Sequence, residues 1–201
     1  MTRIEIVTPT RDQLGECPLW DERSQSLYWI DSHAQLVRRI APASGAYREW
    51  LLPTAIGSIA LCTSGRLLVA LAHGFSYLDL ASGEVTPLAG VTHVAERIRL
   101  NDGRCDRAGR FVCGSLVMGR NEPLAALYQV DARGSVQQLD QGFQISNAIC
   151  FSPDGQWLYY TDSRTRKIMR YPYELATGRA GEPTVWVDTA PLHSAADGAT
   201  V

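Results

Sequence analysis

Four oxygen-bearing side chains recur at matching places along the chain and could bind a metal ion together. Glu16 lies in the stretch LGECPLWD, and each later member also stands at the start of a short apolar run. The first four positions of the series lie five residues before the turn positions at 21, 62, 106 and 152, and the fifth matches through its DG, which resembles the NDG of the third. The series is Glu16, Gly57, Asn101, Asn147 and Asp197.

Two carboxylates and two amides that meet at one place favour a divalent cation. Carboxylates that face one another repel and shift their pKa values, and a bound cation removes that conflict. Oxygen ligands suit Ca²⁺, Mg²⁺ or Mn²⁺, and Zn²⁺ can also be held through carboxylates. The alternative is that Asn and Asp only form turns where strands begin. Because four such side chains share one phase, the metal site is the favoured interpretation.

The positions match because the chain is a repeat of strands and turns. Runs rich in Val, Ile, Leu, Tyr and Trp alternate with Gly, Asp, Ser and Pro clusters, and no long segment has a helical period. The first unit predicts strands near 16–20, 26–31, 36–40 and 46–51. Its second strand, SLYWIDS, resembles WLYYTDS at 157–163, with an Asp at the end of each strand.

The unit starts are 41 to 50 residues apart, which is the size of a four-stranded β-propeller blade. We therefore predict an all-β protein with a single β-propeller domain over residues 1–201. It has four blades and the first strand of a fifth at 197, so it is incomplete at its C-terminal end. A β-solenoid would need shorter rungs, and a two-sheet sandwich would not explain the phase. Because the first strand of each blade lies along the channel, the oxygen side chains should converge at one mouth.

Other polar residues should lie at the same mouth. Arg99 precedes Asn101 by two residues, and a cation there indicates an anionic or oxygen-rich ligand. A surface salt bridge is the alternative for Arg99. The turns between second and third strands carry His33, His73 and Arg120, which are candidate substrate contacts, although such loop residues are more often only solvated.

Composition narrows the class of protein. The chain has 201 residues, 45% of them hydrophobic, and a formal net charge of −2, which suits a soluble globular protein and excludes a broad basic surface for nucleic acid or membrane. No apolar run could span a bilayer, and the N-terminal residues lack a secretion signal. Five cysteines without a CxxC indicate reduced thiols in a cytoplasmic protein. Cys17 could be a nucleophile, but strand alternation directs it opposite to Glu16, away from the channel.

Four spaced stretches resemble the senescence marker protein, gluconolactonase and regucalcin-like family. They are GECPLWD, RLNDGRCDRAGR, ISNAICFSPDGQWLYYTDS and DGATV, in this order from about residue 12 to the end. The resemblance implies a six-bladed propeller with one divalent metal in its channel. It implies that Glu16, Asn147 and Asp197 ligate the metal, and that Arg99 and Asn101 contact the substrate. Members hydrolyse sugar lactones to aldonic acids, with the Asp as the proposed general base.

The predicted function is therefore metal-dependent hydrolysis of a sugar lactone, with the metal as Lewis acid and Asp197 as general base. The alternatives are a non-catalytic calcium-binding protein, an inactive truncated fragment and, ranked last, an interaction propeller of the WD type, whose repeated signatures are missing. Gly119 stands where animal members of the family carry an acidic substrate contact. Six blades need about 270 residues, so we expect a fragment, a truncated product, or a propeller completed by a second chain.

Overall fold

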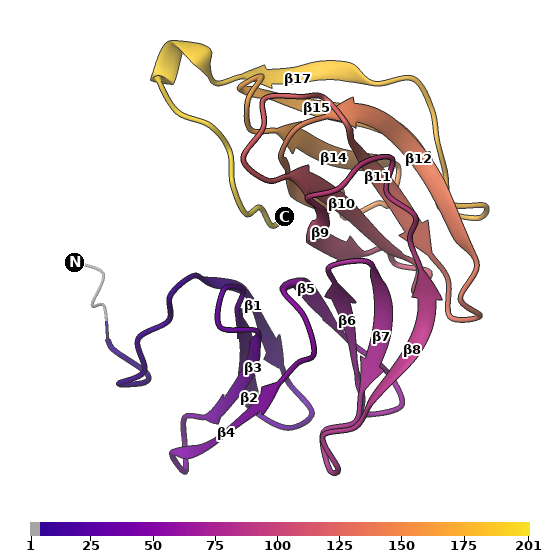
Figure 1. The fold of residues 1–201 in the computed structure, drawn as a ribbon. Coiled ribbons are helices and arrows are strands. Elements are labelled where there is room, and N and C mark those ends of the chain that lie inside the picture. Colours follow the sequence, from indigo (N-terminus) through magenta and orange to yellow (C-terminus); the bar gives the residue numbers. More distant parts are fainter. Residues whose placement is uncertain (1–4) are drawn as a thin grey trace.

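The computed structural model describes residues 5–201, which form four consecutive antiparallel sheets. Figure 1 shows the sheets following one another in an arc, with β1, β5 and β9 on its inner side. The first sheet contains β1 (Gly15–Asp21), β2 (Ser26–Asp31), β3 (Leu36–Ala41) and β4 (Ala46–Leu51). The second contains β5 (Ile56–Leu61), β6 (Leu67–Leu71), β7 (Gly74–Leu78) and β8 (Val85–Gly90).

The C-terminal half adds two further sheets. The third sheet contains β9 (Ile98–Cys105), β10 (Phe111–Val117), β11 (Ala125–Val130) and β12 (Val136–Phe143). The fourth contains β13 (Ser146–Phe151), β14 (Trp157–Asp162), β15 (Lys167–Glu174), β16 (Arg179–Ala180) and β17 (Thr184–Asp188), and it is followed by a short 3₁₀ turn, η1 (Ala190–Leu192). In each sheet successive strands are neighbours, except that β17 pairs with β15. No helix of the described residues is long and apolar enough to cross a membrane.

The strands form where the sequence alternates apolar runs with turn residues. The middle strands are the most apolar: every residue of β6, LLVAL, is buried, as expected for a strand that is covered on two sides. The outermost strands are polar and largely exposed, as in β4 and β12. Turn glycines such as Gly83 and Gly134 have φ values of +82° and +83°, a conformation in which a side chain would be strained.

The hydrophobic core lies between successive sheets. Three of its clusters each combine residues of two neighbouring sheets, so each sheet packs face to face on the next. Burying one such aliphatic or aromatic side chain stabilises the fold by about 1.5–3 kcal/mol. The first cluster includes Ile30 and Ile59, the third includes Leu127 and Tyr160, and in the second the rings of Phe75 and Phe111 lie edge to face with centroids 6.2 Å apart.

The predicted all-β fold with four-stranded antiparallel sheets is confirmed, and the arrangement is consistent with successive β-propeller blades. The strands predicted for the first unit coincide with β1–β4. The predicted first strand of a fifth blade is wrong: residues 197–201 form no strand. A strand forms against a pairing partner, and no described segment pairs with these residues. In the fourth sheet, β16 has only two residues, and β17 takes the long edge of β15 instead.

Candidate functional site

The innermost strands of the sheets meet around a cavity of about 570 Å³. β5 lies between β1 and β9, and β13 lies against β9. The C-terminal segment returns to this centre beside β9 (Figure 1). Glu16, Asn101, Asn147 and Asp197 all line the cavity, together with the backbone at Gly57. The structure thus brings together the whole series that the sequence repeat predicts.

A β-bulge lies at the site position of every inner strand. The pairing register shifts just after Glu16 in β1 and just after Asn147 in β13, and the next residues, Cys17 and Ala148, have φ values of +52° and +55°. The shift in β5 falls at Gly57, and the shift in β9 falls between 100 and 103. A bulge re-aims a side chain, and a left-handed non-glycine residue costs about 1–2 kcal/mol. Glu16 and Asn147 therefore each lie at a β-bulge whose next residue has a strained, left-handed backbone conformation.

A chain of hydrogen bonds links the site side chains across two sheets. Arg99 Nη1 donates to Asn101 Oδ1 at 3.1 Å. Asn101 Nδ2 donates to Asn147 Oδ1 at 3.0 Å and to the Ser146 carbonyl at 2.8 Å. Asn147 Nδ2 donates to Ser163 Oγ at 2.9 Å. Both amides are thereby fixed in orientation, and Asn147 Oδ1 keeps a second lone pair that can face a ligand.

The carboxylates of the cavity are crowded by one another. Burial raises the pKa of Glu16, the charges of Asp197 and Asp102 add to the increase, and the Arg99 cation opposes it. Burial also raises the pKa of Asp102 to about 6, although the N–H groups of Ile149 and Gly103 and the charge of Arg104 act against this, and Asp197 adds to it. A cation bound among these groups would stabilise their ionised forms.

The donor set fits a hard divalent cation. Glu16 and Asp197 offer carboxylate oxygens, and Asn147 offers an amide oxygen, which is the ligand chemistry of Ca²⁺ and similar ions. Within residues 5–201 no three His, Cys, Asp or Glu side chains gather closely enough to hold a metal. The candidate site therefore depends on its amide ligand and is not a cluster of carboxylates.

The other predicted contacts lie outside the cavity wall. Arg99 is buried and reaches the site through Asn101, not by lining the cavity itself. His33, His73 and Arg120 are exposed and do not line it either. His73 instead packs near His93, with ring centroids 5.4 Å apart. These three loop residues are thus not brought to the candidate site.

Cys17 has a different place from the one strict alternation predicts. It does line the cavity, because the bulge after Glu16 interrupts the alternation. Its sulfur is turned towards β5, where it accepts the Ile59 N–H at 3.4 Å and lies 3.7 Å from the Ile59 carbonyl oxygen. Burial raises the pKa of the thiol to about 11, so the expectation that Cys17 packs and does not attack fits its surroundings.

Two charged residues of the cavity wall were missed by the sequence reasoning. Asp102 accepts the N–H of Ile149 at 3.0 Å and of Gly103 at 2.9 Å. Arg104 Nη2 donates to the Ala199 carbonyl at 2.8 Å, which anchors the segment that carries Asp197. The NDG motif contains the only signal, because Asp102 follows Asn101 directly, but strand alternation would place the two side chains on opposite faces.

Comparison with known proteins assigns the chain to a family. The family profile described as "SMP-30/Gluconolactonase/LRE-like region" matches residues 14–201. The chain belongs to this family. As an SMP-30/gluconolactonase/LRE-like protein it is 37% identical to the 6-deoxy-6-sulfogluconolactonase of Pseudomonas putida over 80% of its own length and 55% of that protein. It is 32% identical to Xenopus laevis regucalcin over 89% of its length and 61% of that protein.

The solved structures agree with this family membership. The calcium-binding protein regucalcin from Agrobacterium tumefaciens superposes with a TM-score of 0.90 at 29% identity, covering 96% of this chain and 65% of that one. The SMP-30/gluconolactonase/LRE-like chain spans about 55 to 61% of the length of the curated relatives named above. The resemblance stated from the four sequence motifs is thus confirmed.

Proposed function

We propose that the chain binds one divalent cation in the central cavity and hydrolyses a sugar lactone to its aldonic acid. The observation that carries the proposal is the meeting of oxygen side chains from residues 16, 101, 147 and 197 in one cavity. Relatives named as lactonases support the reaction class, among them the L-arabinolactonase of Azospirillum brasilense, which is 34% identical over 84% of this chain and 57% of that protein.

The residues divide into those that hold the cation and those that handle the lactone. Glu16, Asn147 and Asp197 would hold the cation, which supplies Lewis-acid stabilisation of the oxyanion when bound. Asp197 takes a proton from the attacking water. Arg99 orients Asn101, whose Oδ1 retains a lone pair for a substrate hydroxyl. Fixed orientation of the reacting groups is itself a large part of such a rate enhancement.

The test is acid release from five- and six-membered aldonolactones by chelator-stripped protein, with Ca²⁺, Zn²⁺, Mn²⁺ or Mg²⁺ added in turn. We expect turnover above the spontaneous rate with at least one ion. Asp197→Asn should lose turnover while Glu22→Gln, an exposed carboxylate of the first turn, should keep it. Folded protein that gives only the spontaneous rate with every ion would overturn the enzymatic proposal.

A calcium-binding protein without catalysis is the second candidate, because the same ligands serve it and relatives are named regucalcin. It predicts Ca²⁺ binding that depends on Glu16, Asn147 and Asp197, without lactone turnover. A propeller completed by further chain or by a second chain would favour the lactonase, since the cavity would then be enclosed. The five free cysteines support the proposal that the protein works in the reducing cytoplasm.

A further inference from the structure

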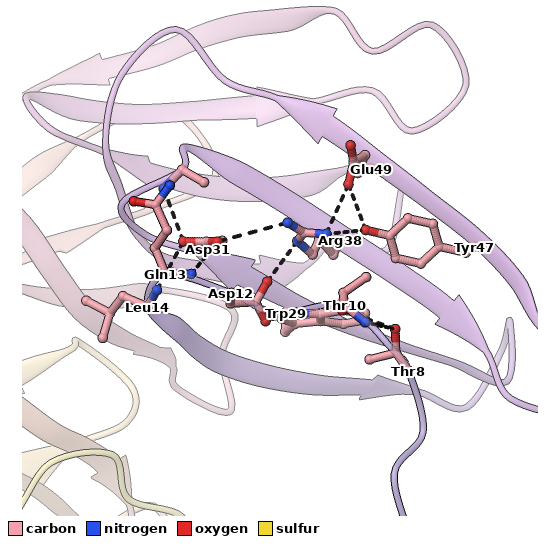
Figure 2. A network of polar contacts seen from close by, with 11 residues as sticks. Thr8, Thr10, Asp12, Gln13, Leu14, Trp29, Asp31, Arg38, Tyr47 and Glu49 are labelled. Carbon is pink, nitrogen blue, oxygen red and sulfur yellow. Dashed lines mark hydrogen bonds and ion pairs between the residues drawn. The ribbon is translucent and has the colours of Figure 1, made fainter.

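The second strands of the first and fourth sheets both end at an aspartate that is followed by a serine, and the two aspartates make matching contacts to the backbone that leads into the inner strand. Asp31 Oδ2 accepts the Gln13 N–H at 2.9 Å, and Asp31 Oδ1 accepts the N–H groups of Leu14 at 3.2 Å and Ala34 at 3.1 Å. Figure 2 shows the Asp31 carboxylate bound to the segment that leads into β1, with Arg38 on its other side. Arg38 Nη2 lies 4.0 Å from Asp31 Oδ2. The segment is thereby fixed two residues before Glu16.

The fourth sheet repeats the contacts to the leading segment, and its third N–H comes from two residues after the aspartate instead of three. Asp162 Oδ2 accepts the Gln144 N–H at 3.1 Å, and Asp162 Oδ1 accepts the N–H groups of Ile145 at 3.1 Å and Arg164 at 3.2 Å. Gln144 and Ile145 stand three and two residues before Asn147, as Gln13 and Leu14 stand before Glu16. We call each aspartate, Asp31 or Asp162, with the N–H groups that it accepts a carboxylate clamp. Such a clamp holds the backbone just before two proposed metal ligands, Glu16 and Asn147.

The serines extend each clamp to the next inner segment. The Ser32 and Ser163 N–H groups donate to the carbonyls of Leu14 at 2.9 Å and Ile145 at 3.0 Å. Ser32 Oγ donates to the Ile56 carbonyl at 2.6 Å, one residue before Gly57. Ser163 Oγ donates at 2.9 Å to the carbonyl of residue 196, one residue before Asp197. Only the second serine therefore connects to a proposed ligand at its far end.

The remaining two sheets show what happens where no ligand is needed. In register, Asp31 pairs with the residue before Glu16, and Asp162 with the residue before Asn147. The equivalent positions are Leu71 in β6 and Ser115 in β10. Neither is an acid, and the inner residues of these sheets, at 57 and 101, are not among the proposed ligands. The carboxylate clamp thus occurs in the two sheets whose inner strands carry a proposed ligand.

We propose that Asp31, Asp162 and Ser163 are positioning residues of the metal site, an inference that rests on the proposed function. Asp31 holds the backbone that presents Glu16. Asp162 holds the backbone that presents Asn147, and Ser163 ties the Asn147 amide to the segment that presents Asp197. Groups that orient metal ligands typically change metal affinity by about 10- to 100-fold when they are removed.

Asparagine is an informative replacement for either aspartate. It keeps the shape and one acceptor oxygen but puts an NH₂ donor where the second oxygen accepted an N–H. One of the two N–H groups in the leading segment is then unpaired, so the ligand backbone is released without a cavity. Ser32→Ala is the matched control for Ser163→Ala, because both remove a hydroxyl that donates to a carbonyl of the next inner segment, and only Ser163 connects to proposed ligands.

The experiment is calorimetric titration of the chelator-stripped chain with Ca²⁺, with the melting temperature of each metal-free variant as a second readout. We expect Asp31→Asn, Asp162→Asn and Ser163→Ala to weaken Ca²⁺ binding by about 10- to 100-fold. Ser32→Ala should lower the melting temperature but keep the wild-type affinity. Ser163→Ala decides the matter if an aspartate variant does not fold, because it removes one half-buried hydroxyl and no strand pairing.

Wild-type affinity in Ser163→Ala, with a melting temperature lowered as in Ser32→Ala, would mean a purely structural role and would overturn the inference. An equal loss of Ca²⁺ affinity in Ser32→Ala and Ser163→Ala would overturn it as well, since the loss would then not depend on a connection to the proposed ligands. If the wild-type chain binds neither Ca²⁺ nor Mn²⁺, the proposed function itself fails, and the positioning role fails with it. Binding by wild type separates these two failures.

Discussion

Gly57 is the one member of the repeated series without a side chain, and replacing it with alanine tests the close approach of the inner strands. A Cβ at residue 57 would lie 2.5 Å from both Cα and the carbonyl oxygen of Asn101, and 2.6 Å from the carbonyl oxygen of Leu100. Ordinary contact begins at 3.4 Å, so the overlap reaches 0.9 Å. All three atoms are backbone, so no side chain can rotate away and β5 and β9 must separate.

The size of the effect follows from this overlap. Overpacking of a tight site costs about 1–3 kcal/mol, and we expect the upper end of that range because backbone must move. For a chain of this length each kcal/mol lowers the melting temperature by about 2–4 °C, which gives a decrease of about 6–12 °C. The displaced Asn101 also carries the 3.0 Å hydrogen bond to Asn147, so metal affinity and kcat/KM should fall in the same variant.

The assay compares Gly57→Ala with Gly90→Ala by thermal melting and by lactone hydrolysis. Gly90 is the matched control, because a Cβ there meets nothing within 4 Å and a surface change of this kind stays within about 0.5 kcal/mol. The reasoning would be refuted if the two variants melted within about 2 °C of each other. It would also be refuted if Gly57→Ala melted early but kept the full metal affinity of the wild type.

Two further predictions concern titratable groups of the cavity. Cys17→Ser should keep kcat, and the wild-type thiol should react slowly with iodoacetamide at pH 8, because burial raises its pKa to about 11; a large loss of kcat would contradict its packing role. For Asp102, burial raises the folded pKa from 3.8 to about 6, so the native state binds more protons than the unfolded chain between these values. Stability of the metal-free wild type should therefore fall as pH rises from about 4 to about 6 and level off above, by up to about 3 kcal/mol. Asp102→Asn should lack this component in urea unfolding at pH 4 to 7, and a wild-type-minus-variant difference that does not change with pH would contradict it.

The sequence predicted the sheets and the oxygen side chains that line the cavity because both depend on a repeat. Inner-strand starts recur with one phase, so the positions of Glu16, Asn101 and Asn147 could be counted out before any strand was placed. Apolar runs and turn glycines then fixed the four sheets. For Asp197 the repeat predicted the place of the residue but not its local structure. Asp197 reaches the cavity on a segment that is held by Arg104 and Ser163 and is not part of a strand.

The bulges could not be predicted from the pattern, and they explain why Cys17 was assigned to the wrong face and why Asp102 was not recognised. Alternation assigns neighbouring residues of a strand to opposite faces, whereas a bulge lets two successive residues line one cavity. Nothing in the letters GECPLW marks a register shift, since the left-handed residue is a cysteine and not a glycine. At this shift Cys17 contacts Ile59 of β5, 42 residues away in the sequence, and a local pattern does not show such a contact.

Gly57 and the oxygen side chains of the series both depend on inner strands that are packed closely and held in place. A ligand must be held within a fraction of an ångström, which demands that neighbouring inner strands lie close and that their bulges stay fixed. Gly57 permits the closeness, because any side chain would strike the backbone of Asn101. The Asp-Ser pairs supply the fixation, because they bind the backbone just before Glu16 and Asn147. In the proposed metal site, Gly57 is thus as necessary as the repeat positions that carry an oxygen.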